Sequence, residues 1–123
     1  MRILIVDDEV KILGLLKSYF EVHGHEAQTT PDGDAALKLI AEYKPELLLL
    51  DLSLKGKLNG KDILQEAQRL LPTIKVIVLS GLLEAQEDEL TRLGASGFLR
   101  KPIQLDELGQ LVENVTSPPP PSA

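Results

Sequence analysis

Polar side chains stand directly after four short, mostly apolar runs of the sequence. They are Asp7 and Asp8 after residues 3–6, Asp51 after residues 47–50, Ser80 after residues 76–79, and Lys101 after residues 97–100. Runs of this length are too short for helices and are typical of strands buried on both faces of a parallel sheet. Because the carboxyl ends of such strands line one crevice, we expect three carboxylates, a hydroxyl and an ammonium to converge there.

This set of groups indicates phosphoryl-transfer chemistry. Three carboxylates in one crevice would raise one another's pKa unless a cation shared them, and oxygen ligands without imidazole or thiolate suit Mg²⁺. Asp51 can act as a nucleophile that forms an aspartyl-phosphate, Ser80 offers a hydroxyl donor, and Lys101 offers a point charge for a phosphoryl oxygen. Each residue alone could simply be the polar end of a strand, so the prediction depends on all five together.

The segments between these runs have the apolar spacing of helices. We expect helices at 9–22, from Asp32 or Asp34 to about 43, from Asn59 or Gly60 to 71, at 82–93 and at 105–115, and a weak strand at 26–30. Asp32 and Asp34, like Asn59 and Gly60, are alternative helix starts. Five strands alternating with five helices predict a doubly wound α/β domain with right-handed crossovers.

Composition sets the broad class. The chain has 123 residues, of which 43% are hydrophobic and 26% are charged, so we expect one globular domain. It contains no cysteine, which excludes thiol catalysis and thiolate metal sites, and its net charge of −6 argues against direct binding of nucleic acid. With no long apolar run and no signal-peptide pattern after Met1, we expect a cytoplasmic protein that does not bind a membrane.

Four segments, taken in this order, resemble the receiver domain of bacterial two-component response regulators. They are residues 3–9, 50–52, 78–81 and 94–102, and the resemblance extends over about residues 2–115. It implies a flavodoxin-like (βα)5 fold with five parallel strands in the order 2-1-3-4-5. We therefore expect a receiver domain at residues 1–116, followed at 117–123 by a proline-rich tail or the start of a linker.

The resemblance also implies roles for the polar groups. Asp51 is similar to the phosphoacceptor of the family, and Asp8, Asp51 and the backbone carbonyl of Ser53 resemble its Mg²⁺ ligands. Asp7 would then act mainly through a metal-bound water.

Further roles concern the response to phosphorylation. By the same resemblance, Lys101 would contact the phosphoryl group, Ser80 would move toward it, and Phe98 would follow as the aromatic switch residue. The bond between Lys101 and Pro102 would be the cis peptide of the family. Phosphorylation adds about two negative charges, and we expect it to bias a rearrangement read by the last two helices and the strand between them.

The function that the resemblance implies is a signalling switch rather than an enzyme, with only self-phosphorylation and autodephosphorylation as activities. The phosphoryl donor would be a histidine kinase or a histidine phosphotransfer protein, and a downstream output domain or protein would read the switch. The domain could equally serve a hybrid kinase or a phosphorelay.

The loop after Asp51 departs from the family pattern. Lys55 stands where proline is usual, and Gly60 follows Asp51 by nine residues rather than eight, which concerns the loop geometry more than the acceptor. The alternative function is a receiver-like module that binds partners without phosphorylation. Such modules usually lose part of the acid, hydroxyl and lysine set, which is complete here.

Overall fold

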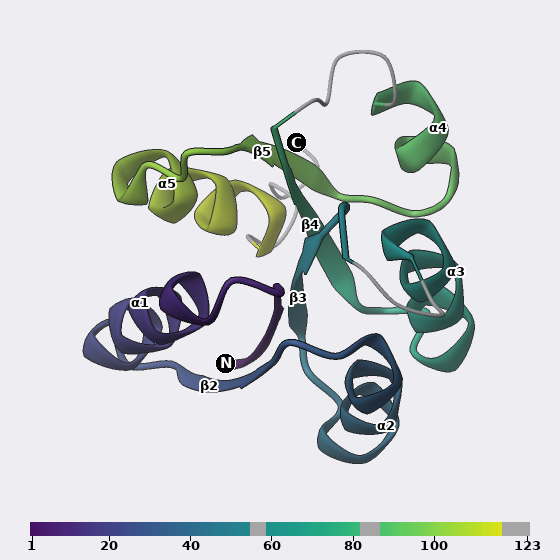
Figure 1. Cartoon of the computed structure of the whole chain (residues 1–123), viewed down its shortest axis with the longest axis horizontal. Coiled ribbons are helices and arrows are strands. Elements are labelled where there is room, and N and C mark those ends of the chain that lie inside the picture. Colours follow the sequence, from purple (N-terminus) through teal and green to yellow (C-terminus); the bar gives the residue numbers. More distant parts are fainter. Residues whose placement is uncertain (55–58, 82–86, 117–123) are drawn as a thin grey trace, which may run out of the picture.

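Five parallel strands form one central sheet with helices on both sides (Figure 1). In this computed structural model, residues 1–54, 59–81 and 87–116 are described. The elements are β1 (Arg2–Val6), α1 (Val10–Val22), β2 (Glu26–Thr30), α2 (Gly33–Tyr43), β3 (Leu47–Asp51), α3 (Gly60–Leu70), β4 (Lys75–Ser80), α4 (Glu87–Arg92), β5 (Gly97–Arg100) and α5 (Leu105–Thr116). The sheet order is β2-β1-β3-β4-β5, which confirms the expected fold class and topology.

The leucine run in β3 shows how the sheet separates two apolar layers. Leu47 and Leu49 belong to a core with residues of α1 and α5, whereas Leu48 and Leu50 belong to a core with residues of α2, α3 and α4. Figure 1 shows the same division, with α1 and α5 on one side of the sheet and the other three helices on the opposite side. All four leucines are fully buried, because successive side chains of a central strand point to opposite covered faces.

The helix ends settle the alternatives that the sequence left open. Asp32 caps α2, since its carboxylate accepts a hydrogen bond of 3.1 Å from the Ala35 N–H. Asn59 caps α3 through a reciprocal capping box with Asp62, so the helix proper begins at Gly60. The cis peptide bond expected between Lys101 and Pro102 is present.

Some expectations fall on residues outside the described ranges. The helix expected at 82–93 is described only as α4, and residues 55–58 of the loop after Asp51 and the tail at 117–123 lie outside the description. Among the residues that are described, no helix is both long and apolar enough to cross a membrane.

Candidate functional site

The polar residues that follow the strands meet at the carboxyl edge of the sheet. Because β1, β3, β4 and β5 are consecutive neighbours, their ends lie side by side. Asp51 is in register with Leu79, one residue before Ser80, and the Lys101 N–H donates a hydrogen bond of 2.9 Å to the Ser80 carbonyl. Backbone pairing in the sheet therefore brings Asp51, Ser80 and Lys101 to the same edge.

Asp51 is a buried carboxylate whose two oxygens have different surroundings. The side chain is 1% exposed. Its Oδ1 accepts hydrogen bonds from the backbone N–H of Ser53 at 3.0 Å and from the Ser53 hydroxyl at 2.9 Å. Its Oδ2 lies 3.5 Å from Nζ of Lys101. No pattern in the sequence indicated this side-chain contact between Ser53 and Asp51.

Lys101 is shared among three carboxylates. Its Nζ lies 3.0 Å from Oδ2 of Asp7, 3.4 Å from Oε1 of Glu9 and 3.5 Å from Oδ2 of Asp51. Burial alone would lower the pKa of Lys101, but Asp7, Asp51 and Glu9 outweigh burial and raise that pKa above its ordinary value. The lysine is therefore held as a cation.

Asp7 is fully buried and incompletely neutralised. Burial raises the pKa of Asp7 above its ordinary value and Asp51 adds to the rise, while the N–H of Glu9 and the ammonium of Lys101 oppose it. Asp7 Oδ2 lies within ion-pair distance of Lys101 Nζ, but it accepts no hydrogen bond from the described residues. A buried carboxylate oxygen in this state favours an additional cation.

Asp7, Asp8 and Asp51 can together hold a metal ion. One oxygen from each lies within 4.8 Å of the others, with Asp8 on the exposed side. An all-carboxylate set suits a hard cation such as Mg²⁺, and the Asp7 oxygen that accepts no hydrogen bond agrees with that fit. The fourth expected ligand, the Ser53 carbonyl, stays a prediction.

Gly60 is needed where the loop after Asp51 returns to the sheet. A Cβ at this position would lie 2.7 Å from Leu52 Cα, 2.8 Å from the Leu52 carbonyl oxygen and 3.0 Å from that of Asp51. These are backbone atoms that cannot turn aside, so the start of α3 can pack against the end of β3 only with glycine. The sequence predicted Gly60 as a possible helix start but not this contact, because chain neighbours alone do not show it.

Ser80 and Phe98, the expected switch residues, lie on the adjacent strands β4 and β5. Ser80 is 6% exposed. Phe98 is half-buried, in register with Val78, and packs against the core beneath α2, α3 and α4. Ser80 ends the strand beside that of Asp51, and Phe98 lies one strand further along the sheet. This placement fits the expected roles, while the motion itself stays a prediction.

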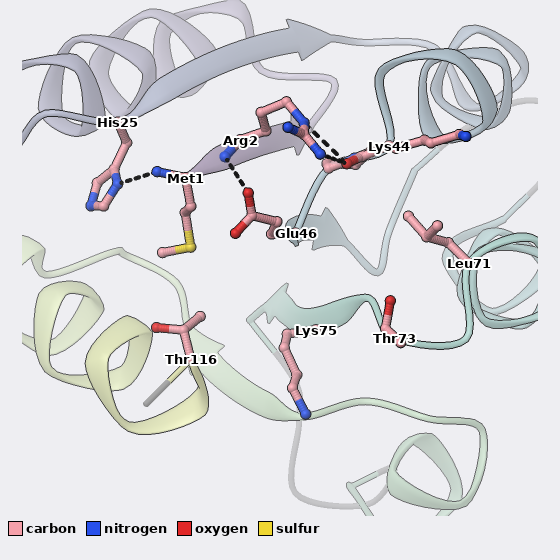
Figure 2. A pocket seen from close by; sticks show the side chains of 10 residues that line it. Met1, Arg2, His25, Lys44, Glu46, Leu71, Thr73, Lys75 and Thr116 are labelled. Atoms are coloured by element: carbon pink, nitrogen blue, oxygen red, sulfur yellow. Dashed lines mark hydrogen bonds between the residues drawn. The ribbon is translucent and has the colours of Figure 1, made fainter. Parts of the chain in front are cut away.

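The opposite, amino edge of the sheet carries a hollow of about 730 Å³ (Figure 2). Its polar groups contact each other: the Met1 amine lies 3.1 Å from His25 Nδ1, and the Arg2 guanidinium donates to the Lys44 carbonyl at 3.0 Å. Figure 2 shows the side chain of Lys44 directed away from the other groups. Charged side chains do not converge here as they do at the carboxyl edge.

The fold and this site define a class of phosphoryl-accepting signalling domain. Residues 3–113 match the family described as the response regulator receiver domain. The chain therefore belongs to that family, whose members are the signalling switches of two-component systems.

Relatives and solved structures agree. The chain is 39% identical over 114 residues to the nitrogen assimilation regulatory protein NtrX of Azorhizobium caulinodans, covering 90% of this chain and 25% of that protein. It is 32% identical over 113 residues to sporulation initiation phosphotransferase F of Bacillus subtilis, covering 91% of this chain and 90% of that protein. The receiver domain of NtrX from Brucella abortus has a TM-score of 0.84 at 36% identity, covering 92% of this chain and 96% of that one. The chain thus spans a quarter of one relative and nearly all of another.

Proposed function

We propose that this protein accepts a phosphoryl group on Asp51 in a Mg²⁺-dependent reaction and relays it as a conformational change. The observation that carries the proposal is the 1% exposed carboxylate of Asp51, placed between two further aspartates and the ammonium of Lys101. Three carboxylates beside one ammonium leave a net negative charge, which favours binding of a metal ion. The metal ion and the ammonium together can then stabilise a phosphoryl group on the carboxylate of Asp51.

In the reaction, a carboxylate oxygen of Asp51 attacks phosphorus. The bond between phosphorus and the donor's imidazole nitrogen breaks, and the imidazole leaves with the electron pair and takes a proton from solvent. Asp8, Asp51 and the Ser53 carbonyl would hold Mg²⁺, with Asp7 supporting it through water, and the ion would neutralise charge on the phosphoryl oxygens. Lys101, already 3.5 Å from Asp51, would pair with a phosphoryl oxygen.

The relay would run through Ser80 and Phe98. The phosphoryl group adds acceptor oxygens beside the end of β4, which favours a move of the Ser80 hydroxyl toward them. Phe98, one strand away and half-buried, could then take the space that becomes free. The surface that reports the change would comprise α4, β5 and α5.

A surface beside the site supports a protein phosphodonor, namely a histidine kinase or a histidine phosphotransfer protein. A hollow of about 420 Å³ is bounded by Lys101, Pro102, Ile103 and residues of α1. Leu15 in its wall is 52% exposed, and Val10 nearby in α1 is 72% exposed. Exposed apolar side chains around the entrance to a charged site fit a partner that docks there and presents its histidine. We place the domain in the cytoplasm, where such donors act, and propose that an output domain or protein reads it.

The test is an intact-mass measurement after incubation with acetyl phosphate, with and without Mg²⁺, followed by mapping of the modified residue. We expect one phosphoryl group on Asp51 that requires Mg²⁺. The variant Asp51→Asn should gain none, while the control Asp106→Asn, an exposed aspartate in α5, should behave as wild type. No adduct on the wild-type protein, together with no binding of beryllofluoride, would instead support the module that acts without phosphorylation.

A further inference from the structure

Glu9 occupies a helix cap position without capping the helix. It is the N-cap residue of α1, where serine, threonine, aspartate and asparagine are preferred, and its side chain makes no capping hydrogen bond. The first turn of α1 contains no other acidic residue. Instead, the carboxylate reaches Lys101, with Oε1 3.4 Å from Nζ. The cap position is thus used for a contact with the phosphoryl-binding lysine.

Glu9 differs from the other two carboxylates that contact Lys101. Asp7 and Asp51 are buried, whereas the Glu9 side chain is 60% exposed and lies on the solvent side of the ammonium. With one Mg²⁺ in place, the charges of the three aspartates and Lys101 would cancel. The carboxylate of Glu9 would then leave the site with a net negative charge, which an approaching anion would meet.

We propose that Glu9 is a specificity-determining residue that holds back small anionic phosphodonors. The inference rests on the proposed phosphorylation of Asp51. The carboxylate acts in two ways: it draws the Lys101 ammonium toward solvent, and it repels an incoming phosphoryl dianion. A freely diffusing donor has no contact surface to offset that repulsion, whereas a protein donor can dock on the apolar hollow whose wall includes Glu9.

A purely structural role makes a different prediction. A carboxylate at the start of a helix stabilises the helix through its dipole, so removing the charge of Glu9 would then lower stability and leave phosphorylation unchanged. Glu9→Ser separates the two roles, because serine removes the charge but is a better N-cap. If Glu9 acts on the donor, both Glu9→Gln and Glu9→Ser accelerate phosphorylation, although their effects on thermal stability differ.

The experiment compares rates of phosphoryl incorporation by intact mass for two donors, the dianion acetyl phosphate and the monoanion phosphoramidate, in Mg²⁺ at low and high salt. We expect Glu9→Gln to react about threefold faster than wild type with acetyl phosphate at low salt, less so with phosphoramidate, and with little difference at high salt. Glu21→Gln is the matched control, because Glu21 is exposed near the other end of α1, and it should react as wild type.

A metal-free readout checks the contact itself. The side-chain NMR resonances of Lys101 should shift in Glu9→Gln without Mg²⁺ and stay in place in Glu21→Gln. Equal rates for wild type and Glu9→Gln, or a threefold gain that salt and donor charge do not affect, would overturn the inference while leaving the proposed function intact. A wild-type protein that takes no phosphoryl group from either donor would overturn both.

Discussion

The two edges of the sheet hold their charges in opposite ways. At the carboxyl edge, Asp7 and Asp51 are 0% and 1% exposed and share one ammonium. At the amino edge, Arg2, Lys44 and Glu46 are exposed, although the hollow there, of about 730 Å³, is larger than the hollow of about 420 Å³ beside Lys101. Charges left in water cost little and attract little, whereas buried charges without full compensation favour a ligand. Buried charge therefore favours the carboxyl edge as the proposed functional edge, whereas the volume of the hollow would favour the amino edge.

The fold itself produces this difference. Each helix follows a strand, so helix N-termini lie toward the carboxyl edge and helix C-termini toward the amino edge. At the amino edge, the Arg2 guanidinium donates to the carbonyls of Tyr43 and Lys44 at the end of α2. Arg2 thus satisfies carbonyl groups at the end of a helix, which is a structural role. Its guanidinium is therefore less available to bind a ligand.

The largest effect is expected for removing the ammonium at the carboxyl edge. Lys101→Ala should slow phosphorylation about 100-fold, because the phosphoryl oxygens lose their cation, yet leave Mg²⁺ binding largely in place. It should also lower the free energy of unfolding in metal-free buffer by about 2 kcal/mol, since Asp7 is left buried without a counter-charge.

Lys75→Ala is the matched change at the amino edge, where the side chain is exposed. It should alter neither the rate nor, by more than about 0.5 kcal/mol, the stability. Phosphorylation rates and chemical denaturation measure both variants. Similar losses in the two would remove the distinction between the edges, and lost Mg²⁺ affinity in Lys101→Ala would show that the lysine has a different role.

A backbone contact gives the next largest effect. Gly60→Ala would push against backbone atoms of Leu52 and Asp51, so we expect about 2 kcal/mol lower stability and about tenfold slower phosphorylation as Asp51 shifts. Gly14→Ala in α1 is the control, because a Cβ there meets nothing within 4 Å and should stabilise the helix by about 1 kcal/mol. Unchanged phosphorylation in Gly60→Ala would show that this packing does not position the acceptor.

The buried charge of Asp7 has a smaller, pH-dependent effect. Since the folded-state pKa of Asp7 is raised above its ordinary 3.8, protonation favours folding, and this contribution is lost as pH rises through the raised pKa. In metal-free buffer, Asp7→Asn should therefore become more stable than wild type by about 1 kcal/mol near neutral pH, and the advantage should shrink toward about pH 4. Mg²⁺ should stabilise the wild type more than the variant. Chemical denaturation across this pH range measures the difference in free energy of unfolding between the variant and wild type. A difference that does not change with pH would show that Asp7 is not a destabilising buried charge.

The smallest effect is expected at the amino edge. Arg2→Gln removes the contacts with the end of α2 and should cost about 0.5 kcal/mol, with no change in phosphorylation rate. Thermal denaturation and intact-mass time courses test this together. A clear loss of phosphorylation would mean that the amino edge contributes to the reaction.

Sequence patterns were sufficient where a local rule decides the structure. The apolar run before Asp51 required a doubly covered strand, and the polar residue after it had to lie at the carboxyl edge. The order of the strands came from the family resemblance rather than from these patterns. The start of α2 stayed open because Asp32 and Asp34 are both good caps, and only the contact with Ala35 decides between them.

The rest depends on contacts between distant segments. Glu9 was expected only as the first residue of a helix, and its approach to Lys101 joins residues far apart in sequence. The run of three acids at residues 7–9 was the available signal, but it does not say which cation each one meets. The contact of Gly60 with Leu52 likewise follows from the path of a loop, which residue types alone do not determine.

The most direct test of the contrast between the edges is an NMR titration of backbone amides with Mg²⁺ and then beryllofluoride, which mimics a phosphoryl group. We predict that the first and largest shifts occur at the carboxyl edge, at Asp8, Ser53 and Gly81, while Arg2 and Glu46 at the amino edge change little. Shifts centred on Arg2 and Glu46, or none at saturating ligand, would contradict the assignment of the site.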